Sequence, residues 1–128
     1  ECAGVVIDLI ATLLFESEEK ITNAEEALKE GQWSDSIYHS YTALVNTAKA
    51  LLTSEQVKTN AQSLIIKNFD EHFVATGQFD LPTSFSEMVY QINQNEPSEV
   101  FANSYLQKAK EFYQQVDIYR AKEVSYAE

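Results

Sequence analysis

The chain has 128 residues, about one domain, and 45% of them are apolar, including seven Phe and seven Tyr. Its formal net charge of −11 excludes the basic surfaces that bind DNA, disfavours RNA and argues against anionic membranes as partners. One cysteine, Cys2, cannot form an internal disulfide, which favours a reducing compartment, the cytoplasm. The apolar run 5–15 is too short to span a bilayer and contains Asp8.

Apolar residues at spacings of three and four predict a first helix that Gly31 ends. Its core stripe is Val6, Leu9, Ile10, Leu13, Leu14, Ile21, Ala24 and Leu28. In the segment 5–15, apolar residues cover nearly the whole circumference, although a bundle covers only one side of a helix. We therefore predict that an outer contact, with a second copy or an upstream domain, is formed by Val5, Ile7, Ala11 and Phe15. The alternative is burial of this helix within its own domain.

The same spacing predicts four further helices. The second runs from an N-cap at Ser34 to Leu52 and buries Ile37, Tyr41, Leu44, Val45, Ala48, Leu51 and Leu52. The third ends at Gly77 and buries Ala61, Leu64, Ile65, Phe69, His72 and Phe73. Ser84 caps a short fourth helix with Phe85, Met88, Val89 and Ile92.

Pro97 is expected in the first turn of a long last helix that buries Ala102, Tyr105, Ala109, Phe112, Val116 and Tyr119. Only three Gly and two Pro interrupt the chain. The sequence therefore predicts an all-α, up-and-down bundle of four to five helices without strands, as one domain spanning residues 1–128.

Few residues have the pattern that chemistry requires. No Glu-x-x-His pair occurs, the three glycines are isolated, and both histidines lie in helical segments without a catalytic motif. We expect His39 and His72 to be partly buried and hydrogen-bonded, and the domain to hold no metal or cofactor. The aromatic residues Trp33, Tyr38 and Tyr41 are candidates for stacking on a nucleotide base or another planar ligand, with core packing as the alternative.

Two segments resemble a known family. Residues 36–52 resemble the second helix of HEPN domains, and residues 62–77, with paired Phe69 and Phe73 and a closing Thr-Gly, resemble the third. The resemblance implies a four- or five-helix bundle that is often dimeric. Some HEPN domains are ribonucleases, some accompany nucleotidyltransferases, and others are appended to unrelated enzymes.

The ribonucleases carry Arg, four to six residues, and His, and the matching segment here is Lys67 to His72. Lysine lacks the planar fork that grips a phosphate, and the neighbouring Asp70 and Glu71 repel RNA. Gln62 stands where some relatives have a histidine. These departures indicate a domain that is not an enzyme, with Lys67 as phosphate ligand and His72 as general base being the catalytic alternative.

The opening residues 1–10 resemble the junction at which a HEPN-like domain follows a sulfite or nitrite reductase in bacterial proteins. The first residue is Glu1, not Met. We therefore expect the C-terminal part of a longer chain, with any sirohaem and iron–sulfur chemistry upstream, because one cysteine cannot ligate a cluster. The leading interpretation is a non-catalytic HEPN-like accessory or dimerisation domain, and the alternatives are a HEPN-type ribonuclease or a module that binds a nucleotide or small ligand.

Overall fold

The computed structural model describes residues 3–55, 57 and 61–127, and the side chains of residues 7–55, 57 and 61–122. Within these ranges the chain forms helices and turns and no strand, so the predicted all-α bundle is confirmed. Three helices are long: α1 (Ala3–Lys29), α2 (Trp33–Ser54) and α5 (Glu99–Ala127). Two are short: α3 (Gln62–Phe69) and α4 (Phe85–Val89).

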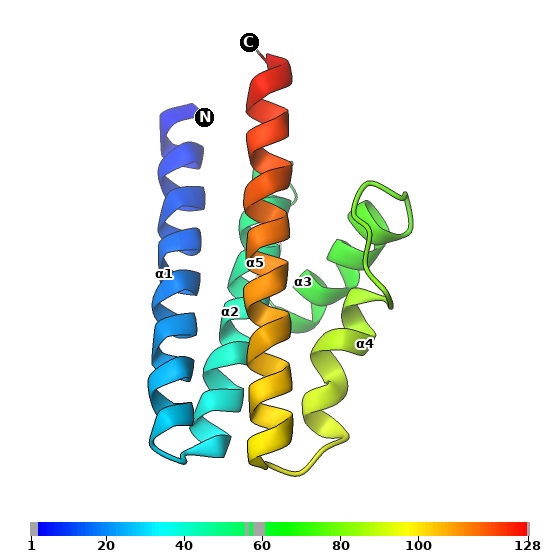
Figure 1. Ribbon diagram of the computed structural model, residues 1–128. Helices are drawn as coiled ribbons and strands as arrows, with labels where there is room; N and C mark the ends of the chain where they lie inside the picture. The colour runs from blue at the N-terminus through cyan, green and yellow to red at the C-terminus, as the bar shows by residue number, and fades with distance from the viewer. Residues whose placement is uncertain (1–2, 56, 58–60, 128) are drawn as a thin grey trace.

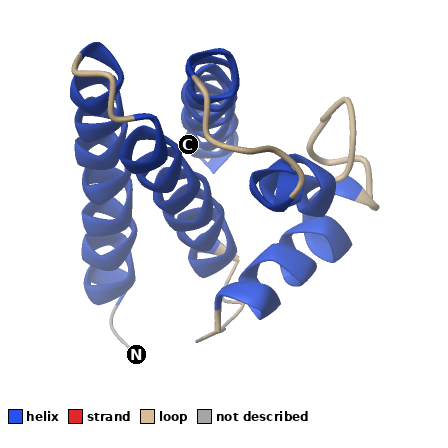
Figure 2. Cartoon of the chain, turned by 90° about the horizontal axis from the view of Figure 1, so that it is seen from below, coloured by secondary structure: helices blue, strands red, loops and turns tan. Residues whose placement is uncertain are grey.

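The long helices set the shape of the bundle. In Figure 1, α1 runs in the opposite direction to α2 and α5 and lies at one edge, while α3 and α4 lie at the other. Figure 2 shows the same arrangement from below. Because α1 packs mainly on α2 and touches α5, much of its outer surface is left without a neighbour within the chain.

The helix ends follow local chemistry. Gly31 lies in the turn after α1. Its φ of +77° is a backbone conformation that glycine adopts without strain. Ser84 caps α4 as predicted: its Oγ accepts from the Glu87 amide at 3.1 Å, and the Glu87 carboxylate accepts from the Ser84 amide at 3.3 Å. The turns therefore end the helices close to where the sequence predicts.

Two predicted helix starts were wrong by one or two residues. Ser34 is not the N-cap of α2, because the helix begins at Trp33, and Gln32 before it makes no side-chain cap. Pro97 lies outside α5, which begins at Glu99. Ser98 is the capping residue instead, since its Oγ accepts a hydrogen bond from the Phe101 amide at 3.1 Å.

Aromatic rings fill the core on the α3 and α4 side. The Phe69 ring is fully buried and lies 4.8 to 5.4 Å, between ring centroids, from four other rings. These belong to Phe73, Phe79, Phe85 and Phe112. Rings at these separations attract each other beyond the hydrophobic gain of burying them. The paired phenylalanines of the sequence are thus the centre of the core.

The contact between α1 and α2 includes small and hydroxyl-bearing residues beside larger apolar ones. The Ser36 hydroxyl donates to the Ala24 carbonyl at 2.9 Å, and the Ser17 hydroxyl lies 3.4 Å from the Ala43 carbonyl. All four residues are buried. Short side chains let the two backbones approach, and the hydroxyls satisfy buried carbonyls that water no longer reaches.

Four residues assigned to the core are exposed instead. On α1, Leu9 is 47% exposed because it falls beside the buried stripe, beyond the width that α2 covers. Ala61 is exposed as the residue before α3, and Leu64 is 48% exposed on the outer side of that helix. His72, the fourth, is rotated away from the core by a change in helix geometry.

That change is a π-helical turn, η1 (Asp70–Val74), which continues α3. Its hydrogen bond runs from the Ala75 amide to the Asp70 carbonyl, five residues back, at 2.8 Å. Within this wider turn Phe73 points into the core and His72 points outward. His39 is partly buried as predicted, but its buried Nδ1 atom has no hydrogen-bond partner among the described residues, which corrects the expectation for that atom.

Candidate functional site

Helix α1 carries an exposed apolar stripe of Ile7, Ala11 and Phe15. Ile7 is 59% exposed, Phe15 is 60% exposed, and Ala11 between them is also exposed. Their spacing of four residues places the three side chains one above another along the helix. The side chain of Val5, the fourth residue predicted for this contact, lies outside the described residues.

Charge is unevenly distributed along α1. The first half, residues 3–15, contains Asp8 as its single charged residue. The second half, residues 16–29, contains Glu16, Glu18, Glu19, Lys20, Glu25, Glu26 and Lys29. The apolar stripe therefore ends where an acidic segment begins.

Part of the acidic segment is held by α5. The Glu25 carboxylate forms an ion pair with Lys110 at 2.5 Å, and Glu18 accepts a hydrogen bond from the Tyr113 hydroxyl. Burial, with the charges of Glu18 and Asp117 nearby, raises the pKa of Tyr113 to about 12. These contacts join the second half of α1 to α5.

The two catalytic candidates, Lys67 and His72, lie on α3 and on η1. Both side chains are exposed, and within the described part of the chain neither makes a hydrogen bond or an ion pair. Among the described residues, no acid or amide orients the imidazole, as a general base requires.

Asp70, a carboxylate between them in sequence, forms hydrogen bonds to another helix. Asp70 Oδ1 accepts a hydrogen bond from the Phe85 amide at 2.6 Å, and its Oδ2 accepts from the Ser86 amide at 2.9 Å and from the Ser86 hydroxyl at 2.6 Å. These are amides at the start of α4, which lack partners within the helix. Asp70 thus joins the π-helical turn to α4 across 15 residues of sequence. Both of its carboxylate oxygens accept hydrogen bonds from that helix.

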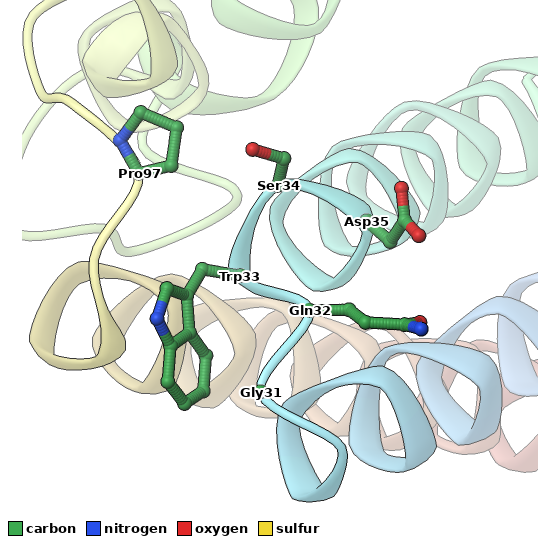
Figure 3. Close-up of a pocket in the computed structure, with 6 residues that line it drawn as sticks. All are labelled: Gly31, Gln32, Trp33, Ser34, Asp35 and Pro97. Carbon is green, nitrogen blue, oxygen red and sulfur yellow. The ribbon is translucent and has the colours of Figure 1, made fainter.

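Of the aromatic candidates, Trp33 stands apart from the two tyrosines. It lines an open hollow of about 310 Å³ at the connection between α1 and α2, together with Pro97 from the segment before α5 (Figure 3). Gly31, Gln32, Ser34 and Asp35 complete the lining. The hollow is open to solvent, so it does not enclose a planar ligand as a binding pocket does.

Tyr38 and Tyr41 do lie together, with ring centroids 6.5 Å apart. The Tyr41 hydroxyl donates to Gln62 Oε1 at 3.0 Å. Burial, followed by the Tyr90 and Tyr38 phenols nearby, raises the pKa of Tyr41 above its ordinary value. Tyr38 is 60% exposed and Tyr90 is partly so. The cluster of Tyr38, Tyr41, Tyr90 and Gln62, which we call the tyrosine cluster, joins α2, α3 and the segment after α4.

Sequence reasoning missed Tyr90 and the role of Asp70. Tyr90 belongs to a 3-10 turn, η2 (Tyr90–Asn93), whose residues show no regular apolar spacing. The pairing of Asp70 with α4 is a long-range contact with no local pattern, although the Ser-x-x-Glu capping box at Ser84 did mark where that helix begins.

The described residues offer no place for a metal: they contain no group of three or more His, Cys, Asp or Glu that could hold an ion. None of the helices in the described ranges combines the length and apolar character needed to cross a bilayer.

Comparison with protein-family models, with curated proteins and with solved structures gave no match. The HEPN resemblance and the reductase junction accordingly stay predictions.

Proposed function

We propose that this chain is a non-catalytic, HEPN-like accessory domain of the cytoplasm that acts by associating with a second copy through the apolar stripe of α1. The observation that carries the proposal is the exposure of Ile7, Ala11 and Phe15 on one side of a helix at the edge of the bundle. Exposure of a row of apolar side chains to water is unfavourable, and their burial on association lowers the free energy.

The acidic charge limits which surfaces of two copies can come together. Two copies with a net charge of −11 each repel one another across most of their surfaces. The first half of α1 presents apolar side chains and the single charge of Asp8, so contact there brings few like charges together. This favours α1 over the other exposed surfaces.

Molar mass measured by light scattering after size exclusion, over a wide range of protein concentrations, tests the proposal. We expect a mass that rises from monomer to dimer for the wild type and stays at monomer for Phe15→Glu. Ile118→Glu is the matched control, because Ile118 is 57% exposed on α5 and lies by the loop of residues 78–80. Equal behaviour of the two variants, or a wild-type monomer at every concentration, would contradict the proposal.

The non-catalytic part of the proposal follows from the exposure of Lys67 and His72 and from the engagement of Asp70 by α4. Purified protein incubated with labelled RNA should give no cleavage above buffer. His72→Ala is the control: cleavage by the wild type that this variant abolishes would establish the ribonuclease alternative.

A second function is favoured by the tyrosine cluster, which presents partly exposed rings beside an amide. Tyr38 and Tyr90 supply flat surfaces for a planar ligand, and Gln62 supplies an amide group that can hydrogen-bond to its edge. A ligand that binds only the folded chain raises its melting temperature. A panel of nucleotides should therefore raise the melting temperature of the wild type more than that of Tyr38→Ala, and equal shifts would exclude this site.

The reductase linkage is a separate proposal that depends on the resemblance of residues 1–10. The coding region upstream of Glu1 tests it directly. A region that encodes sirohaem and iron–sulfur ligands would support the linkage, and the absence of one would remove it without affecting the association of this domain.

A further inference from the structure

We propose that the tyrosine cluster binds a planar organic cation that carries a hydrogen-bond acceptor at its edge. An N-alkylated heteroaromatic ring with a carboxamide substituent is a ligand of this class. The inference rests on the second proposed function, the binding of a planar ligand at this cluster. It adds the charge of that ligand and the group on its edge.

The rings of the cluster favour a cation. Tyr38 and Tyr41 lie three residues apart on α2, with ring centroids 6.5 Å apart and ring planes inclined by 30°. Tyr38 is 60% exposed and Tyr90 is 36% exposed, so a ligand has access to both. The face of a phenol ring is electron-rich and attracts a cation within about 6 Å of the ring centre. Because the first two centroids are so close, one cation can lie within that distance of both.

The charges around the cluster also favour a cation. Burial and then the two neighbouring phenols raise the pKa of Tyr41, and no Lys or Arg in the described part of the chain lies close enough to lower it. Lys108 reaches the segment after α4, but its ammonium donates to Gln91 Oε1 at 2.7 Å. Asp35, an exposed acid three residues before Tyr38, lies on a neighbouring part of the α2 surface.

Gln62 determines which group the ligand needs at its edge. Its Oε1 accepts a hydrogen bond from the Tyr41 hydroxyl at 3.0 Å. The amide nitrogen carries two donors, and among the residues that the structure describes none accepts a hydrogen bond from it. Gln62 is exposed, so these donors are open to a ligand. A carboxamide oxygen on the ring edge is an acceptor that fits them.

A nucleotide meets only part of these requirements. Its base is planar, but its phosphate adds negative charge to a chain whose net charge is already −11. We therefore expect a cationic ring to bind more tightly than the same ring with a phosphate attached. The cluster lies on the surface and encloses less of a ligand than a deep pocket does, so we expect weak binding that needs millimolar ligand.

Three ligands with one ring system test the charge. 1-Methylnicotinamide is a planar cation with a carboxamide, nicotinamide is its neutral counterpart, and nicotinamide mononucleotide carries the cationic ring with a phosphate. Nuclear magnetic resonance titrations of the isotopically labelled chain give dissociation constants from the backbone amide signals around Tyr38 and Tyr41. We expect 1-methylnicotinamide to bind about threefold more tightly than nicotinamide, as cation–π contacts at exposed rings allow. We also expect it to bind more tightly than the mononucleotide.

Two variants show where the cation binds. Tyr38→Leu keeps an apolar side chain and removes the ring, so it should weaken the binding of 1-methylnicotinamide about threefold and that of nicotinamide less. Phe15→Leu is the matched control, because Phe15 is also 60% exposed on the same acidic chain but belongs to α1. It should leave both dissociation constants unchanged, and circular dichroism shows whether each variant is folded. Equal losses in the two variants would mean that the net charge gathers cations at any exposed ring, which overturns the inference.

The contact at the ligand edge has its own test. 1-Methylpyridinium lacks the carboxamide and should bind less tightly than 1-methylnicotinamide to the wild type. Gln62→Leu should bind the two cations equally, because the donors of Gln62 are what distinguish them. The same preference in the wild type and in Gln62→Leu would overturn the edge contact.

The outcomes separate this inference from the proposed function. If none of the three nicotinamide ligands binds at millimolar concentration, both are overturned. If the cation and nicotinamide bind equally and Tyr38→Leu weakens both, or if the mononucleotide binds most tightly, the cationic charge is wrong and the planar-ligand site stands. A preference for the cation that Tyr38→Leu removes and Phe15→Leu retains supports the inference.

Discussion

The two sides of the bundle are held together by different means. Where α3, α4 and α5 meet, large rings around Phe69 interlock, with centroids about 5 Å apart. Where α1 meets α2, the contact uses alanine and serine, and hydroxyls bond to carbonyls of the facing helix. The aromatic side depends on large rings, whereas α1 and α2 also need short side chains at the points where their backbones approach. The first should be most sensitive to truncation and the second to enlargement.

Phe69→Ala should have the largest effect. Removal of a fully buried ring that contacts four others leaves a cavity in the centre of the aromatic side, at a cost of about 3 to 5 kcal/mol of unfolding free energy. Urea denaturation followed by circular dichroism measures this. Phe15→Ala is the same substitution at an exposed ring and should change the unfolding free energy by about 0.5 kcal/mol or less. Similar losses in the two variants would contradict the assignment of the core.

Ser36→Leu tests the opposite sensitivity. Ser36 is fully buried against α1, so a leucine would force the helices apart at a cost of about 1 to 3 kcal/mol. Ser36→Ala keeps the space and removes only the hydrogen bond to the Ala24 carbonyl, for about 1 kcal/mol. A leucine variant as stable as the alanine variant, by urea denaturation, would show that the helices do not approach closely at this position.

Asp70→Ala should show that the aromatic side also needs one polar connection. The substitution removes acceptors for two amides and one hydroxyl at the start of α4, at a cost of about 1 to 2 kcal/mol. Chemical denaturation measures the loss. Asp35→Ala is a control, because Asp35 is an exposed acid in the first turn of α2. An equal loss in the control would mean that charge at a helix start, not the bridge from Asp70, is responsible.

The smallest expected effect concerns pH. The Tyr105 hydroxyl is buried and donates to the Val89 carbonyl at 2.7 Å, and burial raises the pKa of Tyr105 above its ordinary value of 10.0. The folded chain therefore keeps this proton at a pH where the unfolded chain has lost it, so stability is fully present below pH 10 and falls as the pH rises further.

Tyr105→Phe should lessen that fall. We expect it to cost about 1 kcal/mol near pH 7, from the lost hydrogen bond, and to lose less stability than the wild type between pH 9 and about 11. Unfolding by urea at a series of pH values gives both quantities. Parallel curves for the two proteins would exclude Tyr105 as a source of the alkaline dependence.

The sequence was sufficient for the fold because the long helices repeat their apolar spacing over many turns. Leu44, Phe69 and Phe112 were assigned to the core and are buried there. It failed where spacing alone does not determine burial: Leu9 has the correct spacing but lies beyond the reach of α2, and His72 lies within a π-helical turn that no local pattern revealed.

The candidate site was predictable only in part, for a related reason. An excess of apolar residues around one helix segment was enough to select Ile7, Ala11 and Phe15, which are exposed in the structure. Tyr90 joins Tyr38 and Tyr41 through the packing of a short segment that is distant in sequence. Contacts of that kind depend on the whole fold and produce no periodic pattern in the sequence.

The hydrogen bonds from Asp70 to the first amides of α4 also determine how that helix exchanges its amide hydrogens with water. The first amides of a helix normally exchange their hydrogens with water quickly, because no carbonyl of the helix protects them. Here the Phe85 and Ser86 amides are bonded to a side chain that precedes them by 15 and 16 residues. Their exchange should therefore be slow and should report separation of α4 from the π-helical turn, while fraying of α4 itself would leave them protected.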